Sequence, residues 1–332
     1  MTRILVLDQP AHDIPAGEYA DALRERLPEA TIVHTKTTAE TIDAARDADV
    51  ITGTYLNDDV LAAADSLQLF AGAAAGYDHL PLAELRERGV VVTNASGVHG
   101  PNIAEHVIGW LLSITRRLDE GIRRQERHEW RAFQAYGELM GSTVTVVGLG
   151  AIGQAIVERL EPFGVETIGV RYTPEKGGPT DRVVGFDEME SALVETDYLV
   201  LACPLTDETS GLIDQQAFTS LPGHAVLVNI ARGGVVETDA LVRSIQRNGI
   251  RAAALDVTDP EPLPNDHPLW DFENVYLTPH VSGYTPHYFT RLADILAENV
   301  ERLASSDDAG TAETPLRNQV LPETARTSSE NT

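Results

Sequence analysis

Three charged side chains, Arg232, Glu261 and His280, come after segments with the length and composition of buried β-strands. Arg232 follows the apolar run 225–231, Glu261 closes the turn after a second run, and His280 follows a third run at 275–279. In open α/β sheets, ligands bind beyond the carboxyl ends of the strands, so polar groups far apart in the sequence converge there on one small molecule. The pattern predicts an enzyme.

These residue types suit the reduction of a 2-oxo acid. A guanidinium group grips a carboxylate with two donors and polarises the neighbouring carbonyl, which makes Arg232 the expected carboxylate anchor. Imidazole exchanges a proton near neutral pH, so His280 is the expected acid/base, and the Glu261 carboxylate would orient it and favour its charged form. Taken one at a time, each residue also fits a structural role, as part of a surface ion pair or as a capping or core histidine.

A glycine-rich turn at 148–153, with the sequence GLGAIG, follows a strand predicted at 143–147 and precedes a helix predicted at 154–160. Glycines permit a tight turn and a close backbone approach, and the free amides of a helix N-terminus bind a pyrophosphate. Glycines also make ordinary turns, but here the strand, the helix and the next strand follow at the expected spacing. We therefore expect a dinucleotide to be bound by Gly148, Gly150, Ala151, Ile152 and Gly153.

The residue at the end of the next strand decides between the two nicotinamide cofactors. Arg171 stands there, 18 residues after Gly153 (171 minus 153), where an acidic residue would accept hydrogen bonds from the ribose of NAD. A guanidinium accepts none, but it pairs with a 2′-phosphate. We expect NADP(H) to be preferred, with NAD(H) as the alternative and Tyr172 and Thr173 as supporting residues. A solvated strand-end charge is the plainer interpretation of Arg171.

The chain is strongly acidic. Fifty-one acidic residues against 25 basic ones give its 332 residues a formal net charge of -26, and the lysines are Lys36 and Lys176 alone. Such a surface repels phosphates and anionic lipids, which argues against nucleic-acid and membrane partners. Acid-rich, lysine-poor surfaces are typical of proteins from salt-loving organisms, where concentrated cations screen the repulsion. An acidic mesophilic protein is the alternative.

Cys203 is the single cysteine, which excludes an intramolecular disulfide and a cysteine-based zinc cluster. The histidines show no metal-ligand spacing, so no metal site is expected. The first residues have the pattern of a short strand rather than of a signal peptide, and no apolar run approaches the roughly 18 residues of a membrane span. A cytoplasmic protein is expected.

Short apolar segments alternate with helical patterns, which is typical of parallel sheets with crossover helices. The pattern predicts an α/β protein of two doubly wound, Rossmann- or flavodoxin-like parallel-sheet domains. We expect a substrate domain at 1–98 plus 285–320, a dinucleotide-binding domain at 99–284 that includes a long helix over 101–127, and a disordered tail at 321–332. Strands are expected at 4–7, 31–34, 50–53, 67–71, 90–93, 143–147, 166–170, 198–201, 225–229, 252–256 and 275–277.

Motifs in a fixed order resemble those of the D-isomer specific 2-hydroxyacid dehydrogenases. They are GLGAIG at 148–153, CPLTDET at 203–209, NIARGG at 229–234, ALDV at 254–257 with EPLP at 261–264, and TPHVSG at 278–283. The resemblance implies a reversible, nucleotide-dependent reduction of a 2-oxo acid to a D-2-hydroxy acid, with the active site in the cleft between two α/β domains. It also implies a homodimer, joined largely by the arm around the long helix.

The resemblance also implies roles for residues of this chain. Arg232, Glu261 and His280 match the family's catalytic positions, and Asp256 resembles the residue that holds the nicotinamide carboxamide. Ala75 and Gly76 resemble a first-domain loop whose amides receive the substrate carboxylate. Apart from the resemblance, Tyr55 follows the strand predicted at 50–53, and from that position we expect it to line the side-chain pocket. The cofactor's remaining contacts would come from Cys203, Pro204, Thr209, Ile230 and Ala231.

Two alternatives remain within the same fold. One is a nucleotide-sensing binding protein like the family's corepressors, because such proteins retain similar site residues. The other is a short form of phosphoglycerate dehydrogenase, since no regulatory domain is expected after Leu303. The choice of 2-oxo acid stays open, because it depends on the shape of the side-chain pocket.

Overall fold

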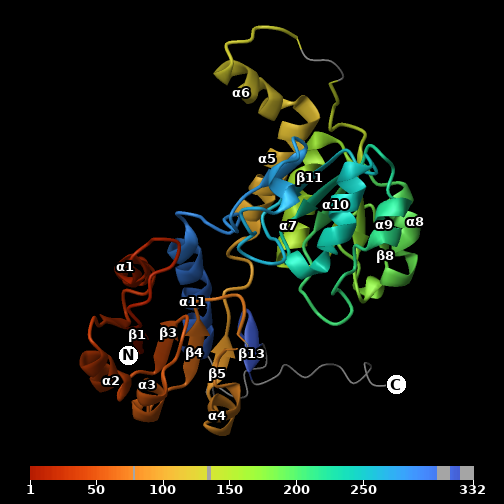
Figure 1. Cartoon of the computed structure of the whole chain (residues 1–332). Helices are drawn as coiled ribbons and strands as arrows, with labels where there is room; N and C mark the ends of the chain where they lie inside the picture. The colour runs from red at the N-terminus through yellow and green to blue at the C-terminus, as the bar shows by residue number, and fades with distance from the viewer. Residues whose placement is uncertain (78, 133–135, 305–314, 322–332) are drawn as a thin grey trace. The chain divides into compact units, whose positions relative to one another are not determined.

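The computed structural model describes residues 1–77, 79–132, 136–304 and 315–321 (Figure 1). The chain forms two compact units: unit 1 is Met1–Val98 with the residues from Tyr284 onward, and unit 2 is His99–Gly283. Each unit is a sheet with helices on both faces, so each buries hydrophobic cores of its own. The predicted fold class, two α/β units with largely parallel sheets, is confirmed.

The sheet of unit 1 has the strand order β13-β5-β4-β3-β1-β2, in which β13 runs antiparallel to β5 and the other pairs are parallel. The chain places β2 on one side of β1 and then returns to place β3 on the other. The strands are β1 (Arg3–Val6), β2 (Thr31–His34), β3 (Val50–Gly53), β4 (Leu69–Gly72), β5 (Val91–Thr93) and β13 (Gln319–Leu321).

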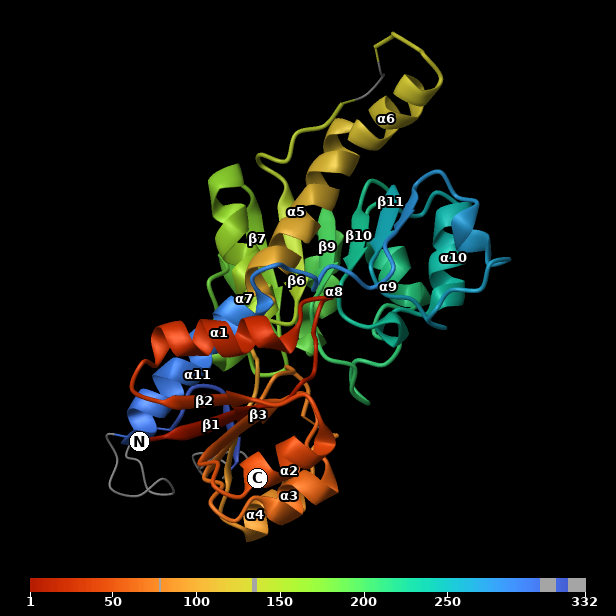
Figure 2. The ribbon, with the colours of Figure 1, turned by 90° about the vertical axis from the view of Figure 1, so that its left-hand side faces the viewer.

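Helices cover both faces of this sheet (Figure 2). α1 (Ala16–Arg26) and α11 (Tyr288–Ala304) pack against each other over one face, and α2 (Thr38–Ala45), α3 (Asp58–Ala63) and α4 (Leu82–Glu87) lie over the other. Side chains alternate along β1, so Ile4 and Val6 join the core with α1 and α11, whereas Leu5 joins the core of the opposite face. Because both faces are buried, the strands are continuous apolar runs.

The sheet of unit 2 is parallel throughout, with the order β12-β11-β10-β9-β6-β7-β8. α5 (Gly100–Arg116) and α7 (Ala151–Leu160) pack over one face, and α8 (Met189–Val194), α9 (Gln215–Ser220) and α10 (Thr238–Gln246) cover the other. The strands are β6 (Thr143–Val147), β7 (Glu166–Val170), β8 (Arg182–Val184), β9 (Tyr198–Leu201), β10 (Val226–Asn229), β11 (Ala252–Leu255) and β12 (Val275–Leu277). Short 3₁₀ helices lie between these elements: η1 (Glu161–Phe163), η2 (Pro174–Lys176), η3 (Phe186–Glu188), η4 (Gly233–Val235) and η5 (Pro268–Trp270).

α6 (Leu118–Glu126) projects from the rest of unit 2 at the end of α5 (Figure 2). Arg117, between the two helices, has a φ of 55°, a left-handed conformation that interrupts the helix. α5 buries residues such as Val107 and Leu111, whereas α6 buries none. The helix predicted over 101–127 is therefore wrong at Arg117, because the helix ends its packing against the sheet there and continues as a charged, exposed segment.

Two strands were not predicted from the sequence. β8 is a short edge strand in which Val184 alone is buried, and β13 has three residues, of which Leu321 alone is buried. Leu321, expected in the disordered tail, instead ends β13 and is 1% exposed, because pairing with β5 buries it. The rest of the expected tail, 322–332, lies outside the described residues. In the described part of the chain, no helix combines the length and the apolar character that a membrane span requires.

Candidate active site

The carboxyl ends of β6 and β9 lie side by side where the chain of unit 2 changes direction across its sheet. β7 and β8 follow β6 on one side, and β9 then pairs with β6 on the other. Ligands of open α/β sheets bind at such a switch point. The GLGAIG turn comes directly after β6 and therefore occupies this position.

Two glycines of the turn stand where no side chain fits. Gly148 has a φ of 97°, and a Cβ there would lie 2.6 Å from the amide nitrogen of Cys203. A Cβ on Gly153 would lie 1.9 Å from the carbonyl oxygen of Gly148. Direct backbone contact thus joins the turn to the end of β9 and to the first turn of α7.

The N-terminus of α7 faces the turn without a side-chain cap. Gly150 is the N-cap residue, and Ala151 and Ile152 begin the helix. The Gln154 side chain donates instead to the carbonyl oxygen of Leu149, at 3.0 Å. The first amides and the positive end of the helix dipole are the groups with which a Rossmann-type turn binds a pyrophosphate.

The end of β7 carries the residues expected to select the cofactor. Arg171 Nη1 donates to the carbonyl oxygen of Gly177 at 2.5 Å, which holds the guanidinium against the turn that follows η2. Tyr172 is 74% exposed, with its ring edge-on to Phe186, and Thr173 is the N-cap residue of η2. The cation is therefore held by the backbone rather than by a carboxylate.

Lys176 is a second cation at the same turn, and the sequence analysis gave it no role. It is the last residue of η2 and directly precedes Gly177, whose carbonyl holds Arg171. Its rarity was a usable signal, because this acidic chain has one other lysine, Lys36. Two cations at one strand end suit a phosphate group.

The segment after β9 packs beside the glycine turn. Cys203 is buried, and burial raises the pKa of its thiol to about 11, so the thiol stays protonated near neutral pH. Thr209 Oγ1 donates to the carbonyl oxygen of Pro204 at 2.6 Å and accepts from Thr206 N at 2.8 Å. Because the Cys203 thiol is buried and neutral, it suits a packing residue beside the glycine turn rather than a nucleophile.

Arg232, Glu261 and His280 follow three neighbouring strands, β10, β11 and β12. The Nδ1 atom of His280 and the Oε1 atom of Glu261 lie 2.6 Å apart. The His280 side chain is 49% exposed and that of Glu261 is 42% exposed, so solvent and small molecules reach both. Glu261 holds Nδ1, and among the described residues none hydrogen-bonds to Nε2, the nitrogen that remains for a substrate.

Asp256, at the end of β11, fixes the segment that carries His280. Its buried carboxylate accepts hydrogen bonds from Thr278 Oγ1 at 2.6 Å, Val281 N at 2.9 Å and Ser282 N at 3.0 Å. Burial opposes its ionisation, but these hydrogen bonds outweigh burial and lower the pKa of Asp256 below its ordinary value. The ionised carboxylate thus holds the segment in which His280 takes a φ of 54°. The sequence analysis gave Asp256 a cofactor role and missed this one.

Arg232 lies at the end of the neighbouring strand. Asn229 shapes its turn, because the Asn229 side chain donates to Arg232 O at 3.1 Å and accepts from Ala231 N at 3.0 Å. Ile230 and Ala231 are buried, whereas Arg232 is exposed, with its Nη1 donating to Ala231 O at 2.6 Å. Within the described residues, no hydrogen bond joins Arg232 to the Glu261–His280 pair. The structure thus brings two of the three residues into contact and puts the third at the adjacent strand end.

In unit 1, the switch point between β1 and β3 is bridged by a side-chain amide. Gln9 Oε1 accepts from Thr54 N at 2.6 Å and from Tyr55 N at 2.9 Å, and Gln9 Nε2 donates to Tyr55 O at 2.9 Å. His79 Nε2 lies 2.7 Å from Thr54 O, and its ring meets the ring of Tyr55 edge to face. Gln9 and His79 thus hold Tyr55, which is 58% exposed.

The loop after β4 contains Ala75 and Gly76, expected at the substrate carboxylate. Both are exposed, and a Cβ added to Gly76 would meet no atom within 4 Å. Asp78, which closes the motif, lies outside the described residues. The loop therefore presents its backbone to open space.

Other histidines of unit 2 have structural partners. His99 Nδ1 lies 3.0 Å from Gly283 O. His106 Nε2 accepts from Trp110 Nε1 at 3.0 Å, and burial lowers the pKa of His106 below its ordinary value. Among the residues that the structure describes, no group of three or more His, Cys, Asp or Glu side chains is arranged to hold a metal ion.

Comparison with known proteins adds a family to this geometry. Residues 108–282 match the model of the D-isomer specific 2-hydroxyacid dehydrogenase NAD binding domain. A glyoxylate reductase of Thermofilum pendens is 35% identical over 250 residues, which cover 73% of this chain and 73% of that protein. A D-3-phosphoglycerate dehydrogenase of Methanocaldococcus jannaschii is 32% identical over 91% of this chain, which spans 57% of the length of that relative.

Solved structures share the fold along nearly the whole chain. An NADPH-dependent glyoxylate/hydroxypyruvate reductase from Sinorhizobium meliloti, solved in complex with citrate, is 30% identical. The match covers 96% of this chain and 100% of that one, with a TM-score of 0.70. The similarity therefore includes both units.

Proposed function

Because the chain belongs to the D-isomer specific 2-hydroxyacid dehydrogenase family, we propose that it reduces a small 2-oxo acid to the D-2-hydroxy acid with NADPH. The observation that carries the proposal is the 2.6 Å contact between His280 and Glu261. Both residues follow the carboxyl ends of strands in the same parallel sheet in which the glycine turn follows β6. An imidazole oriented by a carboxylate, next to a nucleotide-binding turn, suits proton transfer coupled to hydride transfer.

In this mechanism each residue has one role. When bound, the nicotinamide supplies the hydride. Arg232 binds the substrate carboxylate and polarises the adjacent carbonyl, and His280 donates a proton from Nε2 to the developing alkoxide. Glu261 holds Nδ1 and stabilises the charged ring, while Asp256 fixes the backbone of the His280 segment.

The preference for NADPH rests on the end of β7. Arg171 and Lys176 are two cations in one turn, and a 2′-phosphate would accept hydrogen bonds from both. The chain's other residues there, Tyr172 and Thr173, offer a ring face and a hydroxyl. The adenine ribose of NADH brings no charge for these cations, so it binds more weakly.

The substrate class rests on unit 1 and on the relatives. In this proposal, the exposed amides of Ala75 and Gly76 bind the carboxylate, and Tyr55 lies beside the substituent of the oxo acid. Relatives named glyoxylate reductase and glyoxylate/hydroxypyruvate reductase support a small substituent. The match to D-3-phosphoglycerate dehydrogenase supports oxidation of D-3-phosphoglycerate as the second candidate.

We infer a homodimer from the arm of unit 2, which is α6 with the residues that follow it up to Arg131. Large apolar side chains are exposed along it, among them Leu118, Ile122 and Trp130 (52%, 62% and 102% exposed). Beside them lies a cavity of about 640 Å³ with arginine and acidic residues in its wall. A second copy of the arm would cover these groups. Sedimentation equilibrium tests this, and a monomer at micromolar concentration would contradict it.

The proposed activity is tested by following NADPH absorbance with glyoxylate, hydroxypyruvate, pyruvate and a branched 2-oxo acid. Assays in both low and molar salt also test the salt adaptation that a net charge of -26 suggests. We expect saturable oxidation of NADPH and a D-2-hydroxy acid as product. A preference for D-3-phosphoglycerate with NADP⁺ would favour the second candidate. Absence of turnover, together with nucleotide-dependent binding of a protein, would favour a sensor.

A further inference from the structure

We propose that Asn94 is a positioning residue for the substrate-carboxylate loop at Ala75 and Gly76, and that Asn318, in the turn before the C-terminal strand β13, holds Asn94 in place. The inference rests on the proposed function, because it takes this loop as the place where the carboxylate binds. All of the residues involved belong to unit 1.

The loop after β4 has its carbonyl groups held one after another. Tyr288 OH donates to Ala73 O, Ala95 N donates to Ala74 O at 3.0 Å, and Asn94 Nδ2 donates to Ala75 O at 2.7 Å. A trans peptide group is planar, with its N–H pointing opposite to its C=O. Fixing these carbonyls therefore fixes the N–H groups of residues 74–76 toward the other side.

Those N–H groups are the unused ones. Among the described residues, none accepts a hydrogen bond from the amides of residues 74–76, and Ala75 and Gly76 are exposed. Open space lies where a Cβ of Gly76 would stand. Consecutive amides whose peptide planes are fixed, and which have no acceptor among the described residues, are donors preorganised for an anion.

Asn94 is itself held at both ends of its side chain. Its Oδ1 accepts from Ser96 N at 3.1 Å while its Nδ2 donates to Ala75 O, and the residue is 9% exposed. This pair of bonds fixes the orientation of the amide, because exchanging its oxygen and nitrogen would oppose two acceptors and two donors. Asn94 therefore connects the end of β5 to the loop after β4.

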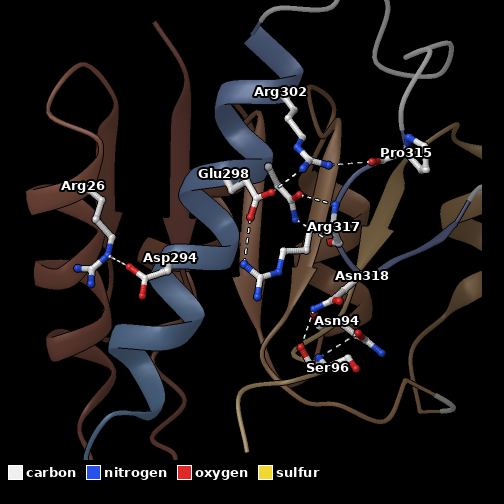
Figure 3. Close-up of polar contacts among 10 residues, drawn as sticks. Arg26, Asn94, Ser96, Asp294, Glu298, Arg302, Pro315, Arg317 and Asn318 are labelled. Carbon is white, nitrogen blue, oxygen red and sulfur yellow. Dashed lines mark hydrogen bonds and ion pairs between the residues drawn. The ribbon is translucent and has the colours of Figure 1, made fainter. Parts of the chain in front are cut away.

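Asn318 holds the other side of Asn94 (Figure 3). Its Nδ2 donates to Asn94 O at 3.1 Å and to Ser96 O at 2.8 Å, and its own carbonyl accepts from Asn94 N at 3.1 Å. Asn318 has a φ of 60°, a left-handed conformation that asparagine adopts more readily than most residues. The turn before β13 is thus hydrogen-bonded to the backbone of both Asn94 and Ser96.

Buried and charged groups on α11 fix this turn in place (Figure 3). Asn299 is fully buried, its Oδ1 accepts from Arg317 N at 2.7 Å, and its Nδ2 donates to Arg317 O at 3.0 Å. Glu298 lies between Arg302 and Arg317, at 2.5 and 3.0 Å, and Leu316 is buried in the core with α1 and α11. The turn before β13 is therefore held to α11 by hydrogen bonds, ion pairs and a buried leucine.

The test measures KM and kcat for the Asn94→Ala protein with glyoxylate and hydroxypyruvate. Loss of the bond to Ala75 O frees the peptide plane, so KM should rise about tenfold, by the same factor for both acids because both present the same carboxylate. kcat should stay within about twofold, since the proton and hydride groups lie in unit 2. The dissociation constant of NADPH should not change.

Asn318→Gly serves as the second variant. Glycine accepts the positive φ without strain, so the substitution removes the side-chain donors and keeps the turn. KM should rise about threefold. Asn248→Gly is the matched control, because Asn248 also has a positive φ, 54°, but lies in an exposed turn of unit 2. Thermal unfolding of all three variants separates positioning from loss of fold.

Binding of oxamate, an unreactive analogue of a 2-oxo acid, to the NADPH complex distinguishes this inference from the proposed function. Weaker oxamate binding by Asn94→Ala supports the inference, even if the wild-type protein reduces no oxo acid. Unchanged KM and oxamate affinity in a folded Asn94→Ala protein overturn it while the proposed function stands. A wild-type protein that neither binds oxamate nor reduces any oxo acid overturns both.

Discussion

The candidate site residues of the two units are of opposite kinds. In unit 2 they are charged side chains at strand ends: Arg232, Glu261 and His280 are exposed, and Arg171 is partly buried. In unit 1 they are backbone amides in the loops after β3 and β4, and the side chains that hold these loops, Gln9 and Asn94, are neutral. Charged groups also occur at the strand ends of unit 1, where His34 Nε2 lies 2.9 Å from Asp8 Oδ1. In both sheets the chain first adds strands on one side of its first strand and then on the other, so each sheet has a switch point. Similar topology thus supports different roles.

The difference follows from what each edge must do. Proton transfer needs a group that changes charge, and such a group must stay partly solvated or be paired, as His280 is with Glu261. Arg232 brings a charge to the substrate carboxylate, whereas in this proposal the loop of unit 1 adds donors with fixed directions and no charge of their own to desolvate. Backbone amides fulfil this, provided that something fixes their peptide planes. In unit 1, Asn94 and its neighbours do so.

The largest effect is expected at His280. In His280→Gln, kcat should fall by about 10²- to 10⁴-fold, the range typical of a lost general acid, while NADPH binds as before. His224→Gln is the matched control, because His224 Nε2 contacts Asp197 at 2.8 Å in the same unit but before the amino-terminal ends of β10 and β9, and 65% of its side chain is exposed. Steady-state kinetics and nucleotide titration measure both. A His280→Gln protein with wild-type kcat would remove the acid/base role from unit 2.

A smaller effect is expected for cofactor choice. Arg171→Ser should lower the ratio of kcat/KM for NADPH to that for NADH by about 10- to 100-fold, because a charged hydrogen bond to the 2′-phosphate contributes about 1.5–3 kcal/mol. Arg182→Ser is the control, since Arg182 pairs with Glu195 on the surface but begins the neighbouring strand β8, at its amino end. Should the wild-type protein prefer NADH, the assignment of Arg171 and Lys176 to a phosphate fails.

Glu261→Gln tests how much the Glu261 carboxylate contributes to the role of His280. The substituted amide has nearly the same shape but no charge, so it orients the His280 ring less firmly at Nδ1. We expect kcat for reduction to fall about tenfold or less, with the dissociation constant of NADPH unchanged. Steady-state kinetics and nucleotide titration of both proteins measure this. An unchanged kcat would make the contact between Glu261 and His280 merely structural.

The charged candidate site residues of unit 2 could be predicted from the sequence, whereas the neutral side chains that hold the loops of unit 1 could not. Arg232, Glu261 and His280 each follow an apolar run, and the glycines at 148 and 153 mark a turn in which a Cβ would collide with backbone. Gln9 and Asn94 belong to no such pattern. An uncharged amide looks the same in a loop, on the surface or in a clamp, and its partners appear only when distant segments meet.

The same limit explains the errors in the fold. The break at Arg117 reflects where α5 stops packing on the sheet, and β13 forms because its backbone pairs with β5. Neither contact changes the hydrophobic periodicity of the sequence, which is the signal from which helices and strands are predicted. Lys176 differs, since the rarity of lysine in this chain was visible from the start.

The most direct test of this division is a crystal structure of the protein with NADPH and oxamate. We expect the oxamate carboxylate to bond to Arg232 and to the amides of Ala75 and Gly76. Its carbonyl oxygen should lie about 2.6–3.2 Å from His280 Nε2, the range for proton transfer. Oxamate bound with its carbonyl away from His280, or held by side chains of unit 1 without those amides, would contradict the account. It assigns charged side chains to the site residues of unit 2 and backbone amides to those of unit 1.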